Sequence, residues 1–375
     1  MPLFRDTVVS CPVDLPRSAL RRMVQLVRLL EQLSRRPAYR EAVWPEVPLS
    51  ARHDPGHAAV MMGYDFHLDG AGHPWLIEVN TNAGGALLAY LAHHPSASQA
   101  QAAMPERLLR RFLDPFAAEM HQFSHGRLPR PSHLVIIDER PPEQFLYREM
   151  EALAQLFRQS WGTRVSIVDP QQLQAGAEGV FADGQRVDLI YNRHCDFYLE
   201  SPPLAGVRAA WLAGTVCLTP NPFIYGLLGD KRRMGLWSDA ASLPLLGLNR
   251  AEIDLLTGTV PSTCLLTESN REELWRSRQQ WVFKPVDRFG SRGVFLGRKI
   301  SRTRFDLLPP TQTLAQREIP PSETFCTPDE PMKTDFRLFA YRQRPLGVTA
   351  RLYRGQVTNL RTPGGGFAPV RIFPR

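Results

Sequence analysis

Apolar and polar positions follow two different periods along this chain, which predicts a mixture of helices and strands. Residues 16–36 carry apolar side chains at the spacing of one helix face, with arginines on the other flanks. The pattern predicts an amphipathic helix that Asp14 caps and Pro37 ends. The apolar stripe of this helix consists of Leu20, Met23, Val27 and Leu30.

The middle of the chain alternates between strand and helix patterns. Short apolar runs predict buried strands, and the longer segments between them have the period of helices. Such alternation is typical of a parallel sheet. The predicted strands cover 133–139, 163–173 and 187–193, and the predicted helices cover 143–162 and 207–213.

A carboxylate and a carboxamide lie two residues apart on a short apolar strand, in the segment LIEVNTNAGG (76–85). Positions i and i+2 of a strand face the same way, so Glu78 and Asn80 present their oxygens together. Asp65, beyond a predicted hairpin turn, can supply a third oxygen. Oxygen ligands suit magnesium. The alternative is a buried edge strand with a capped turn.

Lys284 ends another apolar strand, just before a loop that contains Gly290, Ser291, Arg292 and Gly293. Glycine-loop amides beside basic side chains favour polyphosphate binding, although the loop lacks the Walker A pattern. A lysine that reaches solvent from a strand end is the alternative. Upstream, Lys231 follows Asp230 at the start of a predicted helix.

Basic residues also mark the strand-like segments near the end of the sequence. Arg337 lies in TDFRLFAY, Arg351 lies in TARLYRG, and Asn359 follows. Either arginine could instead be a structural ion-pair partner, with Asp335 as one candidate acceptor.

Together these segments resemble the ATP-grasp family, in particular its glutathione-synthetase-like branch. The resemblance rests on the Asp230-Lys231 pair, the Lys284 strand with its glycine loop, the segment from Gln316 to Ile319, the arginine strands and the acidic hairpin. It implies that ATP is bound by Lys231, Lys284, Gly290, Ser291, Arg292, Gly293, Gln316, Glu318 and Ile319. It also implies that Asp65, Glu78 and Asn80 hold Mg²⁺, and that Arg337, Arg351 and Asn359 serve catalysis.

The order of the segments departs from the usual family layout, because the metal strand precedes the arginine strands here. The chain therefore resembles a circularly permuted member. The expected fold is α/β (α+β): a permuted ATP-grasp core with a Rossmann-like parallel-sheet lobe. The predicted domains are 1–125 with the metal hairpin, 126–222 with the parallel sheet, and 223–375 with the nucleotide-binding lobes.

The resemblance implies an ADP-forming ligase. A carboxylate substrate would attack the γ-phosphoryl group of ATP, and an amine or thiol acceptor would displace phosphate from the acyl phosphate. Two alternatives remain: a small-molecule kinase on the same fold, and a nucleotide-binding regulatory module without turnover.

Composition changes this picture little. The 375 residues allow two or three lobes, and no apolar run is long enough for a membrane span. The formal charge of +8 raises the possibility of nucleic-acid binding, but the arginine-rich segment fits a solvated helix better and no nucleic-acid motif is present. Five scattered cysteines predict reduced thiols and a cytoplasmic protein, and a homodimer is possible.

Overall fold

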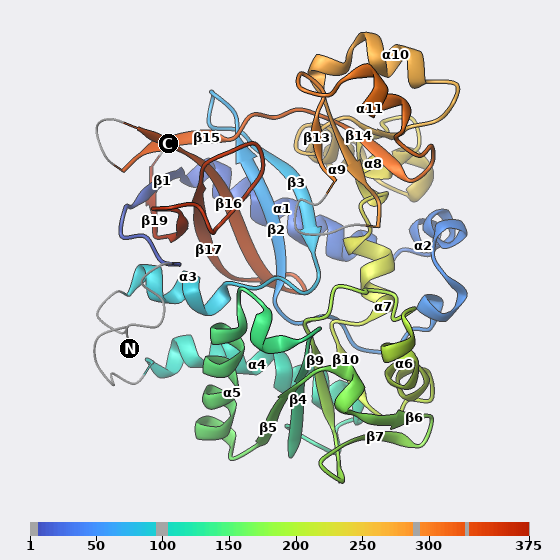
Figure 1. Ribbon diagram of the computed structural model, residues 1–375, viewed down its shortest axis with the longest axis vertical. Helices are drawn as coiled ribbons and strands as arrows, with labels where there is room; N and C mark the ends of the chain where they lie inside the picture. Colours follow the sequence, from blue (N-terminus) through green and yellow to red (C-terminus); the bar gives the residue numbers. More distant parts are fainter. Residues whose placement is uncertain (1–6, 95–103, 288–292, 327–329, 375) are drawn as a thin grey trace.

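The computed structural model describes residues 7–94, 104–287, 293–326 and 330–374. A central antiparallel sheet lies between a parallel sheet and a smaller antiparallel sheet (Figure 1). The mixed α/β character expected from the sequence is therefore confirmed.

The central sheet joins the two ends of the sequence. Its hydrogen-bonded order is β18-β17-β16-β2-β3, and β15 pairs with β16 in addition. Strands from residues 62–80 thus extend the sheet built by residues 322–368. The strands are β2 (Met62–Leu68), β3 (Pro74–Asn80), β15 (Ser322–Phe325), β16 (Pro331–Tyr341), β17 (Arg344–Tyr353) and β18 (Gly366–Ala368).

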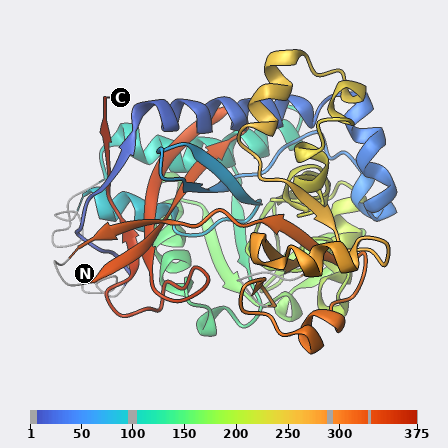
Figure 2. The same cartoon turned by 90° about the horizontal axis from the view of Figure 1, so that it is seen from above.

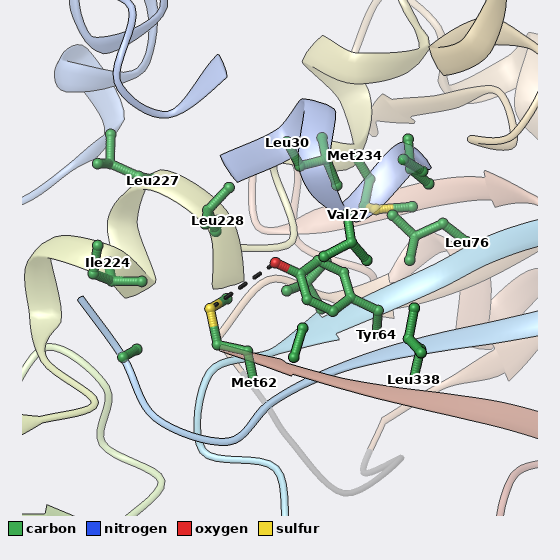
Figure 3. Close-up of a cluster of buried hydrophobic side chains, with 14 of the residues drawn as sticks. Val27, Leu30, Met62, Tyr64, Leu76, Ile224, Leu227, Leu228, Met234 and Leu338 are labelled. Carbon is green, nitrogen blue, oxygen red and sulfur yellow. Dashed lines mark hydrogen bonds between the residues drawn. The ribbon is translucent and has the colours of Figure 1, made fainter. Parts of the chain in front are cut away.

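Helix α1 (Arg17–Leu33) runs along one face of the central sheet (Figure 2). The predicted apolar stripe is mostly buried, because Met23, Val27 and Leu30 are each at most 1% exposed. Val27 and Leu30 pack in one buried cluster with Tyr64 and Leu76 of the sheet (Figure 3). Burial of this stripe attaches the first helix to the sheet.

The predicted ends of this helix need correction. The N-cap residue is Pro16 and no side chain caps the helix. Asp14 instead pairs with Arg371, with Oδ1 at 2.6 Å from Nε, because β1 (Val13–Pro16) runs parallel to β19 (Val370–Phe373). Pro37 begins the next helix, in agreement with the preference of proline for a first helical turn.

The predicted parallel sheet is confirmed, with the order β10-β9-β4-β5. Phe116 of the preceding helix α4 (Glu106–Phe123) lies edge-on against Phe157 and Tyr191, with ring centroids 4.8 Å and 5.0 Å away. A helix from the first predicted domain therefore packs into this core. The elements are β4 (His133–Ile137), α5 (Tyr147–Trp161), β5 (Arg164–Val168), β9 (Leu189–Asn192), α6 (Ala205–Leu212) and β10 (Cys217–Thr219).

The smaller sheet has the order β11-β14-β12-β13, and all its pairs are antiparallel. Phe283 and Ala315 of this sheet share a buried cluster with Phe305 of the helix that covers it. The elements are β11 (Thr263–Leu265), α10 (Arg271–Arg276), β12 (Trp281–Pro285), β13 (Phe295–Leu296), α11 (Arg302–Asp306) and β14 (Thr313–Arg317).

The remaining elements connect these sheets or lie at their borders. Within the described ranges, no helix combines the length and the hydropathy that a membrane crossing requires. The remaining helices are α2 (Pro37–Val43), α3 (Ala86–His93), α7 (Pro222–Ile224), α8 (Arg233–Ser238) and α9 (Arg250–Thr257). A small separate sheet contains β6 (Gln174–Gly176), β7 (Gly179–Ala182) and β8 (Gln185–Arg186).

A disulfide corrects the expectation that the cysteines are reduced. Cys11 and Cys326 are bonded across 315 residues of sequence, whereas Cys195, Cys217 and Cys264 form no disulfide. The bond joins the segment before β1 to the residue that follows β15. Sequence separation hid this pair, because only the folded chain brings the two segments together.

Candidate functional site

A cavity lies between the central sheet and the smaller sheet. Its wall is built from β3, from β12 and β14, and from the loop that follows β17. The structure thus brings to one place residues that are more than 200 positions apart in the sequence. Residues predicted from the sequence that line this cavity are Glu78, Lys231, Lys284, Gln316, Glu318 and Ile319.

Lys284 connects the two sheets by hydrogen bonds. Its Nζ donates to Gln316 Oε1 at 2.6 Å and to the Ile77 carbonyl oxygen of β3 at 3.3 Å. Burial lowers the pKa of Lys284 to about 8, which Lys231 reinforces and Glu78 opposes. A bound anion would therefore stabilise the charged form of this buried lysine.

The segment after β14 forms another part of the wall. Glu318 is paired with Arg298, and the Ile319 carbonyl oxygen accepts a hydrogen bond from His67 Nδ1 at 2.6 Å. Burial lowers the pKa of His67, although Asp335 and the hydrogen bond to Ile319 oppose this shift. His67 therefore ties β2 to the segment from Gln316 to Ile319.

The three predicted metal ligands do converge. Asn80 Nδ2 lies 3.1 Å from Asp65 Oδ2 and 3.3 Å from Glu78 Oε1. The cause is local: Asp65 and Glu78 face each other across the hairpin, and Asn80 follows on the same face of β3. Within the described ranges, no cluster of three His, Cys, Asp or Glu side chains is arranged around a metal position.

Asp65 is held by two arginines. Arg337 Nε and Nη2 lie 2.6 Å and 2.7 Å from its two oxygens, and Arg351 Nη2 lies 2.9 Å from Oδ2. Burial would raise the pKa of Asp65, but these guanidinium groups lower it below the usual range. Both Asp65 oxygens are thus already engaged by cations.

Arg337 and Arg351 differ in the number of side-chain nitrogens that donate hydrogen bonds. Arg337 also donates through Nη1 to the Gly84 carbonyl oxygen at 3.0 Å, so it spans β16, β2 and the turn before α3. Arg351 donates through Nε to Asp335 at 2.5 Å. Among the hydrogen bonds of the described residues, none engages Arg351 Nη1. Arg351 therefore retains a donor for a ligand, whereas the three donor nitrogens of Arg337 are engaged.

Other predicted nucleotide contacts have mixed placements. Lys231 lines the cavity directly after Asp230, whose buried carboxylate pairs with Arg232 and accepts from the Tyr198 hydroxyl at 2.8 Å. Gly293 has a φ of 74°, which favours glycine. Gly290, Ser291 and Arg292 lie outside the described residues.

Asn359 is not brought to the cavity. It is exposed, and its Oδ1 accepts from the Arg361 backbone N–H at 3.0 Å, which forms a local turn. The residues just before it, from Gln356 to Thr358, line the cavity instead. Asparagine is common at such turns, and this explains the position without a ligand.

Two charged residues that the sequence predictions omitted follow strands of the parallel sheet. Arg193 follows β9 and donates to the Asn82 carbonyl oxygen at 2.5 Å. Asp138 follows β4, and burial raises its pKa to about 6 although Arg193 opposes the shift. Ligands of open α/β sheets bind at the carboxyl ends of parallel strands. The sequence did contain a signal for these two residues, because each is a charged residue near the end of an apolar run.

The donor set fits a magnesium ion through Glu78 and Asn80. In the structure Asn80 turns its amide nitrogen to the two carboxylates, which leaves Oδ1 free for another partner. Magnesium commonly takes one or two protein oxygens together with phosphates and water. Asp65 fits this role less well, because both its oxygens already bind guanidinium groups.

Comparison with solved structures identifies the fold. The chain resembles a glutathione synthetase-like effector from Globodera pallida, with a TM-score of 0.58, 10% identity, and coverage of 98% of this chain and 90% of the other. It also resembles a "Putative gamma-glutamylcysteine synthetase" from Methylobacillus flagellatus KT, with a TM-score of 0.50, 16% identity, and coverage of 94% and 88%. No protein-family model and no curated protein sequence matches the chain. The chain has a glutathione-synthetase-like fold.

Proposed function

We propose that this protein is an ADP-forming ligase of the ATP-grasp type, which joins a carboxylate to an amine or thiol acceptor through an acyl phosphate. The observation that carries the proposal is the cavity where Lys284, Lys231 and Glu78 meet at the contact between two sheets. The glutathione-synthetase-like fold supports the same conclusion. The order of the hairpin and the arginine strands supports a circularly permuted version of that core.

ATP would occupy this cavity with its phosphates at Lys284 and Lys231. The smaller sheet would hold the base and ribose near Gln316, Glu318 and Ile319, which line the same wall. Glu318 would have to exchange Arg298 for a ribose hydroxyl. Charge-assisted hydrogen bonds from the two lysines would supply most of the affinity for the phosphates.

Glu78 and Asn80 would hold a magnesium ion beside the phosphates, where it would neutralise their charge. We assign Asp65 a different role from the one expected from the sequence. Its carboxylate orients Arg337 and Arg351, which would otherwise be two like charges buried side by side. Arg351, with its remaining donor, would stabilise the negative charge of the phosphoryl group during transfer.

The carboxylate substrate would approach from the side of the parallel sheet. Arg193 lies against Asn82, two residues after Asn80, so it connects that sheet to the metal-binding strand. A guanidinium at this position suits a carboxylate ligand. The proposal needs no side-chain nucleophile, since positioning and charge neutralisation are sufficient for phosphoryl transfer.

Trapping of the acyl phosphate tests the reaction class. The protein would be incubated with ATP, Mg²⁺ and a panel of amino acids and short peptides, offered singly and in pairs, and ADP release would be measured. Hydroxylamine converts an acyl phosphate into a hydroxamate, so a ligase yields hydroxamate when its carboxylate substrate is present. A small-molecule kinase would release ADP with a hydroxyl acceptor and yield none. Nucleotide binding without ADP release under every condition would favour a regulatory module.

A further inference from the structure

A second cavity, with a volume of about 390 Å³, lies between helices α3 and α4 and strands β16 and β17. None of its described wall residues lines the cavity that contains Lys284. Its walls are largely apolar and include the rings of Tyr90, Phe112 and Phe339. A volume of this size falls in the range of small-molecule sites, about 300 to 1,000 Å³.

Gly347 opens the backbone of β17 to this cavity. A Cβ atom added to Gly347 would meet no heavy atom within 4 Å, and its φ is not positive. Neither a left-handed conformation nor close packing therefore explains a glycine inside this strand. A glycine inside a strand weakens it and often marks a β-bulge or a place where a ligand or another backbone approaches closely. Gly347 lies opposite Phe339, beside an irregularity in the strand pairing.

The permanent positive charge of the cavity is that of Arg111, and burial lowers the pKa of His93. Arg111 lines the cavity and donates through Nη1 to the Leu346 carbonyl oxygen at 3.1 Å, which fixes the guanidinium at the wall. His93 and His94 line it as well, whereas the described wall residues include no aspartate or glutamate. The ring of His94 lies 4.8 Å from that of Tyr90. The polar groups of this wall thus suit an anionic ligand atom.

We infer that this cavity binds a small aromatic carboxylate. The rings of the ligand pack against Phe112 and Phe339 and over Gly347, and its carboxylate accepts hydrogen bonds from Arg111. Flat rings fit a wall of aromatic side chains with a bare backbone between them. The inference does not depend on the proposed ligase activity, because the two cavities share no described wall residue.

The charge of the ligand is tested with 2-naphthoate and its neutral counterpart 2-naphthamide, by isothermal titration of the full-length protein. We expect one naphthoate site with an affinity at least about tenfold higher than that for the amide, as a charge-assisted hydrogen bond implies. Arg111→Gln should remove this difference. Arg110→Gln is the matched control, because Arg110 lies on the same helix with its side chain 66% exposed. Equal effects of both substitutions would overturn the assignment, as would the absence of saturable binding.

The place of the ligand is tested by filling the cavity. Gly347→Val should reduce naphthoate affinity at least about tenfold and leave the melting temperature unchanged or higher, because the added side chain enters open space. Ala89→Phe fills the same cavity from α3 and provides a second test should the first variant fold poorly. Unchanged naphthoate affinity in a folded cavity-filling variant would show that the ligand binds elsewhere and overturn the inference.

Discussion

Lys284 is the residue whose chemistry is most altered by the fold. In the proposed function its charge binds phosphate, yet burial lowers its pKa to about 8. We predict that ATP affinity stays constant from about pH 6.5 to 7.5 and falls as the pH rises through 8, since the neutral amine loses its charge-assisted contact. Titration of nucleotide affinity against pH measures this. Lys284→Arg should remove the dependence, because a guanidinium stays protonated; an equal loss in that variant would contradict the prediction.

The free energy of unfolding should rise as Lys284 loses its proton, whereas the ATP affinity falls. The pKa of Lys284 is lower in the folded chain than its ordinary value of 10.5, so the unfolded chain binds this proton more tightly. Without nucleotide, the contribution of this group to the free energy of unfolding should therefore rise between about pH 8 and pH 10.5. Denaturant unfolding at several pH values, compared with Lys284→Met, isolates that contribution.

Asp65 and Glu78 face each other across one hairpin but should respond differently to loss of charge. Asp65→Asn leaves Arg337 and Arg351 close together without their shared carboxylate, so it should reduce the free energy of unfolding by about 3 to 5 kcal/mol. Glu78→Gln should keep the fold and abolish the Mg²⁺ dependence of nucleotide binding. Unfolding curves and nucleotide titrations with and without Mg²⁺ measure both effects. If the Asp65→Asn protein is as stable as the original and loses only the Mg²⁺ dependence of nucleotide binding, Asp65 is a metal ligand after all.

Residue types and their spacing predicted several of the side chains that the fold brings together, but not the pairs that they form. The i, i+2 spacing placed Glu78 and Asn80 on one face, and Lys284 could be recognised from the loop that follows it. The Asp65–Arg337 contact joins residues 272 positions apart and depends on β2 lying beside β16. No local pattern contains that information.

At the scale of elements, the disulfide between Cys11 and Cys326 is the feature that the sequence did not predict. It ties the segment before β1 to the residue that follows β15, at the edge of the central sheet. We predict that Cys11→Ser with Cys326→Ser, or a reductant, lowers the free energy of unfolding by about 2 to 4 kcal/mol. Cys264→Ser, which removes a free thiol, is the control. Five reactive thiols in the denatured, unreduced protein would show that the bond does not form.

Elements with a strong period were the most predictable. The predicted strand at 133–139 corresponds to β4 and the predicted helix at 143–162 corresponds to α5. Their signal is local, since an apolar run or stripe must be buried wherever it lies. Short elements such as β13 and β18 depend on partners elsewhere in the chain. The cap assigned to Asp14 was wrong for a related reason, because its partner Arg371 is 357 residues away.

At the scale of the molecule, the central sheet requires both ends of the sequence. The hairpin of β2 and β3 pairs with β16, and α1 covers the sheet (Figure 2). Helix α4 also packs against the core of the parallel sheet through Phe116. Residues 1–125 therefore supply parts of two cores, so the predicted boundary at residue 126 separates segments that stabilise each other.

The proposed permutation can be tested by moving the ends of the chain. A fragment that begins at Gly126 loses α1, the β2–β3 hairpin and α4, so we expect it to expose apolar surface, aggregate and bind no ATP.

A rearranged chain would run from 126 to 374, continue through a short glycine-serine linker, and end with 13–125. Because β1 and β19 are parallel, with Val13 opposite Val370, the linker from residue 374 must run back along these two short strands to reach residue 13. The loop before β4 is exposed, which favours new ends there. We expect this chain to regain a cooperative unfolding transition and Mg²⁺-dependent ATP binding, measured by thermal unfolding and titration. Cys326→Ser is included in both chains and in the full-length control, because the rearranged chain lacks Cys11. ATP binding by the fragment alone would place the whole nucleotide site after residue 126 and contradict a permuted core, as would a folded rearranged chain that binds no ATP.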